Sequence, residues 1–187
     1  YKNFSGWNNG PTPSGCTADQ DNLSIITSVN GFTYRLDDHS DDPNVNPTAV
    51  NINNASFSNS GIITTNSDKD VFKFNVTKDG QMHIDANPFS VGPNNEGADL
   101  DIKLTLLNSA SQVIQVYNPV NILNATIDTV LIPGAYFLVV EGTGNINVSN
   151  YGSLGSYTIS GTFTPITITP IRQVAVSGKT DKSKHTL

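Results

Sequence analysis

Cysteine is almost missing from this sequence, and its scarcity excludes a disulfide framework inside the chain. Cys16 is the one cysteine among 187 residues, so no internal bridge can form. The chain does not need such a bridge, because a domain near this size buries roughly 70% of the surface of its unfolded chain. Cys16 is therefore either a free thiol or half of a bond to another chain or domain.

Charged residues are also sparse, and this narrows the classes of partner. They make up 14% of the chain, which has a net charge of −6. That sign opposes contact with a phosphate backbone, and the basic cluster of Lys179, Lys182 and Lys184 lies in a tail, so we expect no nucleic-acid partner. Asn, Ser, Thr and Gly occupy the places that Lys and Glu take in cytosolic proteins, which indicates a secreted, extracellular protein.

The sequence also lacks long apolar runs and a leader. No run approaches the roughly 20 residues that span a bilayer, so we expect no membrane span. Tyr1 opens the chain without the charged and apolar leader of a secretory signal. These features are typical of a mature or excised fragment of a secreted protein.

Histidine is too rare and too scattered to form the metal site of a zinc hydrolase. Such a site needs about three protein ligands, most often His, around a water of lowered pKa. His39, His83 and His185 show no ligand spacing, and the sequence has no HExxH helix and no G-x-S-x-G elbow. We therefore expect a protein that is not an enzyme.

Short strands separated by turn residues are what the sequence does contain. Residues 99–106 alternate strictly between apolar and polar, and residues 71–76 and 112–117 are further strand candidates. Residues 136–140 are apolar without alternation, which predicts a strand covered on both faces, and we expect the N-terminal segment to cover its outer side. The pattern favours an all-β sandwich of about eight to nine strands, with a barrel as the alternative.

Composition divides the chain into three parts. Residues 1–43 form an irregular N-terminal segment, rich in Asn, Gly and Pro, which ends in an acidic stretch closed by Pro43. Residues 44–164 hold the strands of the sandwich. Residues 165–187 begin with alternating Ile and Thr between two prolines, so this extended tail is a linker, an edge strand or a strand that pairs with another molecule.

Four stretches of the strand region carry a family resemblance. They are DKDVFKF at 68–74, LDIKLTLL at 100–107, PGAYFLVV at 133–140 and YTISG at 157–161. In this order and spacing, residues of about 44–164 resemble the bacterial pre-peptidase C-terminal domain. The resemblance implies a jelly-roll-like sandwich carried by a secreted peptidase, with an upstream peptidase-like domain as its partner.

The N-terminal segment resembles a different family. Trp7, DNLSIIT at 21–27 and NGFTYRLDDH at 30–39 are similar to the last stretch of a reprolysin-like zinc metallopeptidase domain, over residues of about 1–42. The HExxH motif of that family is absent, so none of its catalytic residues can be assigned here. The resemblance also implies that Cys16 is bridged to the upstream domain.

Acidic residues at the connector and at strand starts suggest a calcium site. Hard cations bind carboxylate and carbonyl oxygens, and some members of the resembling family bind calcium near the junction with the preceding segment. The alternative is that these residues only terminate strands and begin turns. The candidate ligands are Asp37, Asp38, Asp68, Asp70, Asp99 and Asp101, with Asp41 and Asp42 in the same connector.

Surface features supply two further sets of candidates. Sequons for N-linked glycans occur at Asn3, Asn22, Asn54, Asn75, Asn124 and Asn147, although a chain so rich in Asn, Ser and Thr contains such triplets by chance. The alternation of residues 72–76 predicts that Asn75 lies on the wet face of its strand. Exposed aromatic rings bind sugars, and the candidates for such a platform are Trp7, Tyr117 and Tyr151.

Three functions are compatible with these features. The first is a non-catalytic extracellular accessory module of a secreted peptidase-like protein, serving stability, attachment to a cell surface or matrix polymer, or maturation. The second is a glycosylated subunit of an extracellular fibre, a homopolymer joined through terminal strands, because an exposed sheet edge accepts an added strand. The third is a carbohydrate-binding module.

Overall fold

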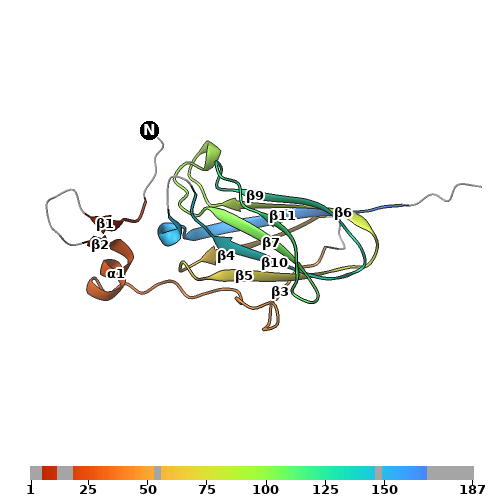
Figure 1. The fold of residues 1–187 in the computed structure, drawn as a ribbon, viewed down its shortest axis with the longest axis horizontal. Coiled ribbons are helices and arrows are strands. Elements are labelled where there is room, and N and C mark those ends of the chain that lie inside the picture. Colours follow the sequence, from red (N-terminus) through yellow and green to blue (C-terminus); the bar gives the residue numbers. More distant parts are fainter. Residues whose placement is uncertain (1–5, 12–18, 53–55, 146–148, 168–187) are drawn as a thin grey trace, which may run out of the picture.

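The fold was obtained as a computed structural model that describes residues 6–11, 19–52, 56–145 and 149–167 (Figure 1). In this part of the chain, nine strands form two sheets packed face to face, which confirms the predicted all-β sandwich. No helix of the described residues is long and apolar enough to cross a bilayer. Several predicted features lie outside the described residues, namely Asn3, Cys16, Asn54, Asn147, the tail beyond residue 167 and His185.

The larger sheet has five strands in the order β3, β5, β10, β7, β8. Its strands are β3 (Thr48–Ala49), β5 (Lys69–Val76), β10 (Gly134–Gly142), β7 (Ile102–Asn108) and β8 (Val113–Tyr117). All neighbours are antiparallel except β3, which pairs with β5 in parallel. The strands β5, β7 and β8 are those expected at residues 71–76, 99–106 and 112–117.

The smaller sheet has four antiparallel strands in the order β4, β11, β6, β9. They are β4 (Ser56–Ile63), β11 (Gly155–Pro165), β6 (Gly80–Pro88) and β9 (Ala125–Leu131). Along β11 the buried and exposed residues alternate strictly, so this strand lends one face to the core and the other to solvent.

The core lies between the two sheets and consists of the inward side chains of both. Burying one large apolar side chain of this kind contributes about 1.5–3 kcal/mol relative to leaving it exposed. The largest fully buried members include Phe72, Met82, Ile84, Leu104, Ile127 and Tyr157. Apart from Phe72, which follows Val71, these residues have polar neighbours on both sides in the sequence, which explains why periodicity predicts the sandwich.

Strand β10 is buried on both faces, as its unbroken apolar sequence predicts. The expectation that the N-terminal segment covers its outer face is wrong. Phe137 and Val139 instead form a second small cluster with Val71 of β5 and Leu107 of β7. The Lys73 ammonium also lies 5.7 Å from the centre of the Phe137 ring. Neighbouring strands of the same sheet therefore supply the cover.

The N-terminal segment lies at one end of the sandwich, whereas β11 ends at the opposite end (Figure 1). It contains a two-stranded ribbon, β1 (Asn9–Pro11) and β2 (Asp19–Asp21), and then the short helix α1 (Asn22–Ser24), which continues as a π-helical turn over Ile25–Val29. Short 3₁₀ turns occupy Pro93–Asn95 and Asn150–Gly152.

Tyr151 anchors this segment to the sandwich. Its hydroxyl accepts a hydrogen bond from the Leu23 backbone N–H at 2.8 Å and donates one to the Asp21 carboxylate. The same carboxylate accepts from the Ser24 N–H and so caps the start of α1.

Candidate functional site

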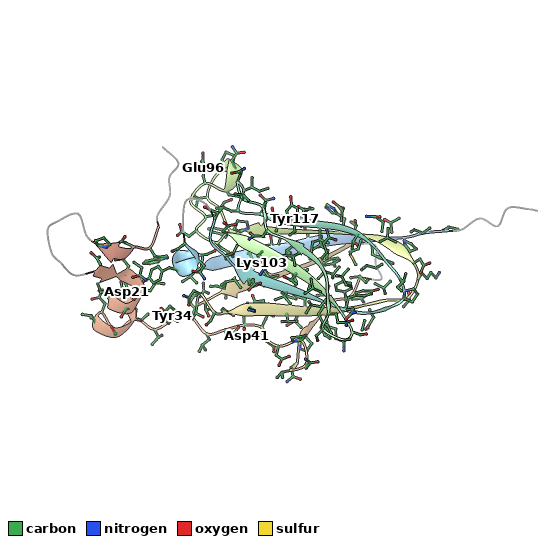
Figure 2. The ribbon with its side chains drawn as sticks, in the orientation of Figure 1. Asp21, Tyr34, Asp41, Glu96, Lys103 and Tyr117 are labelled. Atoms are coloured by element: carbon green, nitrogen blue, oxygen red, sulfur yellow. The ribbon has the colours of Figure 1, made fainter. Side chains whose placement is uncertain are left out.

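Residues 37–43, which we call the connector, join the N-terminal segment to the sandwich and are fixed to both sheets. The Asp38 carboxylate accepts a hydrogen bond of 3.1 Å from the Ile62 N–H in β4. The Asp41 carboxylate accepts one of 2.9 Å from the Lys69 N–H at the start of β5. The connector therefore bridges the two sheets at one end of the sandwich, where Figure 2 shows Asp41 beside β5.

His39 secures the middle of the connector. One ring nitrogen, Nδ1, lies 2.7 Å from the Thr48 hydroxyl, and the other, Nε2, lies 2.9 Å from the Ser60 carbonyl oxygen. The ring also contacts Phe72, with centroids 4.7 Å apart. Both ring nitrogens of His39 therefore have partners, one in β3 and one in β4. The side chain links the connector to the two sheets.

Aspartates of the connector meet aspartates at the start of β5. Two groups of three possible ligand atoms occur in the described part of the chain, and within each group the atoms lie within 4.8 Å of one another. One group is Asp37, Asp41 and Asp68, and the other is Asp38, His39 and Asp70. We refer to the five aspartates of these two groups as the acid cluster.

Asp68, a member of the acid cluster, is a buried carboxylate with only one of its two oxygens hydrogen-bonded. Its side chain is 6% exposed, and its Oδ2 accepts hydrogen bonds from the N–H and the hydroxyl of Thr64 at 2.5 and 2.8 Å. Its Oδ1 is buried and has no hydrogen-bond partner among the described residues. Burial raises the pKa of Asp68, and the negative charges of Asp37 and Asp41 raise it further.

Asp70 is likewise a buried carboxylate with only one of its two oxygens hydrogen-bonded. It is 0% exposed, and its Oδ2 accepts a hydrogen bond of 2.5 Å from the Tyr157 hydroxyl of the opposite sheet. Its Oδ1 is buried and unpaired within the described ranges. Burial raises the pKa of Asp70 to about 7, against the opposing effect of the Tyr157 hydrogen bond.

Glycine at position 61 makes the contact between Asp70 and Tyr157 possible. An added Cβ at Gly61 would collide with both the Tyr157 hydroxyl and the Asp70 carboxylate. The close approach of β4 to this pair therefore requires a residue without a side chain.

The donor set of the acid cluster fits a hard divalent cation. Calcium binds six to eight oxygens, whereas zinc prefers nitrogen and sulfur, and the nitrogens of His39 are engaged elsewhere. The adjacent Lys69 ammonium pairs with Glu141 at 3.5 Å, so this lysine has a carboxylate partner outside the acid cluster. Two buried oxygens without partners and several neighbouring negative charges are what a bound cation would satisfy.

The remaining predicted ligands, Asp99 and Asp101, do not join the acid cluster. Asp101 is fully buried; its Oδ2 accepts from the Asn145 amide at 2.7 Å, and its backbone N–H donates to the Ser153 hydroxyl at 2.8 Å. Burial raises the pKa of Asp101. Its visible role is to tie the loop after β10 to the start of β7.

A groove of about 500 Å³ opens beside the acid cluster, between the N-terminal segment and the four-stranded sheet. Arg35 and Asp38 form its wall on the N-terminal side, and Phe89 is an exposed ring on the opposite side. Polar side chains complete the lining, among them Ser60, Asn87, Ser90, Ser156 and Thr158.

The structure places only some of the predicted glycosylation sites and aromatic sugar-binding candidates. Asn75 is exposed on β5, as the alternation predicts, whereas Asn124 accepts a hydrogen bond from the Asn95 amide. Tyr117 lies on β8, well apart in Figure 2 from Asp21, the partner of Tyr151. The three aromatic residues do not form one platform, and both glycosylation and sugar binding stay predictions.

Comparison with known proteins adds a likeness of fold. No protein-family model matches the sequence, and no curated protein matches it. The pre-peptidase C-terminal domain of a collagenase from Bacillus anthracis is similar, with a TM-score of 0.44, 14% identity and coverage of 70% of this chain and 100% of that one. PliG of Salmonella Typhimurium, a periplasmic inhibitor of g-type lysozyme, is similar with a TM-score of 0.38 and 17% identity. The match covers 63% of this chain and 99% of that one. PliG of Aeromonas hydrophila has a TM-score of 0.38 and 14% identity, over 63% of this chain and 96% of that one. At these values the likeness extends to the sandwich alone.

Proposed function

We propose that the chain is a non-catalytic, extracellular β-sandwich module of a secreted peptidase-like protein, in which calcium fixes the preceding segment to the sandwich. The observation that carries the proposal is the pair of buried carboxylate oxygens without partners, Asp68 Oδ1 and Asp70 Oδ1, beside the acidic connector. Leaving a buried polar group unsatisfied costs about 1–3 kcal/mol, so the fold gains when a bound cation satisfies these oxygens.

Calcium at this place would also shape the attachment surface. Asp38 belongs both to the acid cluster and to the wall of the adjoining groove. A cation that holds Asp38 against β5 would hold that wall in place, which links calcium to binding of a surface or matrix polymer in the groove. The position between two parts of one chain suits a module that sets the geometry of a neighbouring domain.

Calcium titration of the full chain by calorimetry tests this proposal. We expect saturable binding and a higher melting temperature, because a ligand at about 100 times its Kd adds about 2.7 kcal/mol to the free energy of unfolding. Asp68→Asn removes one ligand charge and is expected to abolish both effects. Asp42→Asn is the matched control, since Asp42 lies in the same connector, outside both ligand groups. Absence of binding to the unaltered chain, or equal losses in the two variants, would refute the site.

A second candidate function, the fibre subunit, is favoured by a separate observation. Strand β8 closes one edge of the larger sheet with exposed apolar side chains. An edge of this kind is suited to accepting a strand from another copy. The carbohydrate-binding alternative has less support, because Tyr151 already uses its hydroxyl to anchor the N-terminal segment.

A further inference from the structure

Strand β8 is an apolar edge strand exposed on both of its faces. It pairs with β7 on one side and stands last in the sheet order, so its other backbone edge faces no strand of the described residues. Four of its five side chains are apolar and between 38% and 62% exposed: Val113, Ile114, Val116 and Tyr117. Val120 and Ile122, in the segment that follows, are also exposed.

The usual protections of an edge strand are weak here. Natural edges carry charged residues, prolines or bulges that prevent association with another chain. No charged residue occurs between Lys103 and Asp128, and β8 itself contains no proline. Its one irregularity is a bulge at Ile114, which leaves Gln115, Val116 and Tyr117 in regular pairing with β7. Such an edge is chemically prepared to accept an uncharged strand.

The tail of the chain has the composition of such a strand. Residues 164–171 consist of Ile, Thr and Pro and carry no charge, and Arg172 then adds one positive charge before the apolar residues Val174 and Val176. The eleven residues from Ile166 to Val176 span about 35 Å when extended, roughly twice the 17 Å of a five-residue strand. The tail is therefore long enough to cover all five residues of β8, and Arg172 is the one charged residue within it.

The direction of the strands decides which copy can receive the tail. The ladders β11–β6, β6–β9, β10–β7 and β7–β8 are all antiparallel, and the chain reverses between β9 and β10, so β8 runs opposite to β11. The last described anchor of the tail is the hydrogen bond from the Ile166 N–H to the Asp79 carbonyl, at the end of the sandwich remote from the N-terminal segment.

A tail that continues along β11 therefore moves away from its own sandwich. On a copy displaced along the long axis it would meet β8 in antiparallel orientation. To reach its own β8 it would have to turn back and pair in parallel, the less stable arrangement.

We propose that residues 166–176 of one copy add as an antiparallel strand to the free edge of β8 in the next copy, giving head-to-tail filaments. The inference rests on the fibre function proposed above and names its contact surfaces. The contact is heterologous, because tail and edge are different parts of the molecule, so repetition without closure makes a filament instead of a closed dimer.

A complementation experiment with two defective chains tests the contact. The first is the chain shortened to residues 1–165, which keeps β8 and lacks the donor; the described buried apolar side chains all precede Pro165, so its core is complete. The second is full-length Val116→Lys, which keeps the donor and places a charge on the acceptor edge. Leu36→Lys is the control, because Leu36 is an exposed apolar residue, 91% accessible, outside both surfaces.

We expect the unaltered chain and Leu36→Lys to form filaments in negative-stain micrographs. Each defective chain alone is expected to be monomeric by light scattering, with unchanged circular dichroism. Mixed together, they are expected to give one-to-one heterodimers and nothing larger, because one copy supplies the only donor and the other the only acceptor.

Three outcomes would overturn the proposal. If both defective chains still form filaments, a fibre exists but uses other surfaces, and the inference fails while the fibre function stands. If the unaltered chain stays monomeric at every concentration, both fail. If it is monomeric and removal of the tail speeds hydrogen exchange in β8, the tail covers its own edge and the pairing between copies is refuted.

Discussion

Asp70 is the residue at which burial and charge conflict most directly. Its carboxylate is fully buried between the sheets, with one oxygen held by Tyr157 and the other without a partner in the described part of the chain. The negative charge of a buried carboxylate can be neutralised by a proton or by a bound cation. Burial raises the pKa of Asp70 and so favours the protonated form. Without calcium, the proton is the available choice near neutral pH.

The apo protein is therefore expected to become more stable as the pH falls from 8 to 5. The pKa of Asp70 is about 7 in the folded state and about 4 in the unfolded chain, so between these values the folded state binds more protons and stability decreases as pH rises. Thermal melts in a chelating buffer measure the effect.

Asp70→Asn removes this titration, and its melting temperature is expected to change much less over the same range. Asp68 contributes in the same direction, because its pKa is also raised. A melting temperature of the unaltered apo chain that falls on acidification from pH 8 to 5 would contradict the assignment. In excess calcium the cation replaces the proton, so the gain on acidification is expected to shrink.

At the scale of single elements, β6 and β9 are joined by a cross-strand histidine clasp on the solvent face of the smaller sheet. His83 Nδ1 lies 2.7 Å from the Asp128 carboxylate, and Nε2 lies 2.9 Å from that of Asp85. The Thr126 hydroxyl donates to the second Asp85 oxygen at 2.6 Å. Both ring nitrogens face acceptors, which favours the protonated imidazolium.

NMR titration is expected to give His83 a pKa above its ordinary value of 6.5. The Asp128 hydrogen bond is the largest cause of the shift, and the Asp85 hydrogen bond comes next. The stability that the clasp adds is fully present below the unfolded pKa and is lost as pH rises through the folded one. Asp128→Asn is expected to lower the pKa of His83, with Asp79→Asn as a control on the turn before β6. An unchanged His83 pKa in the Asp128 variant would contradict the clasp.

Local sequence pattern predicts the elements far better than it predicts their partners. The alternation at 99–106 and 71–76 identifies β7 and β5, because inward and outward positions are fixed by the pleat. The cover of β10 was not predictable from periodicity, since it comes from side chains on two flanking strands that are distant in the sequence.

In the candidate site, too, the sequence predicts the residues better than it predicts their contacts. Asp37, Asp38, Asp68 and Asp70 stand out as acids at a connector and a strand start, and the structure brings them together. The contact of Asp70 with Tyr157 spans 87 positions and crosses the sheets, so no local signal reveals it. Asp99 and Asp101 have the same local signature and still lie apart, because their strand begins on the other side of β10.

At the scale of the whole molecule, the charges are distributed unevenly. Five aspartates gather at one end, in a chain whose net charge is only −6. The N-terminal segment enters the sandwich at this same end (Figure 1). Repulsion within the acid cluster weakens the hold of the connector on the sheets, and a divalent cation reverses that effect. The local attachment of the N-terminal segment is therefore expected to depend on calcium, whereas local opening of the turn between β5 and β6 is not.

Limited proteolysis with trypsin can separate these two parts. Residues 31–38 are all exposed, and Arg35 gives trypsin a cleavage site directly before the connector. Cleavage requires the substrate chain to leave its resting conformation, so its rate follows the free energy of local opening. We expect calcium to slow cleavage after Arg35 about tenfold, which corresponds to about 1.4 kcal/mol of added local stability.

Lys78 provides an internal control in the same digest. It lies in the exposed turn between β5 and β6, away from the acid cluster, so calcium is expected to leave the cleavage there unchanged. Asp68→Asn is expected to be cut after Arg35 at one rate with and without calcium. If calcium slowed both sites equally, it would be acting on the protease or on the whole fold, and if the Asp68 variant were still protected, the cation would be bound elsewhere.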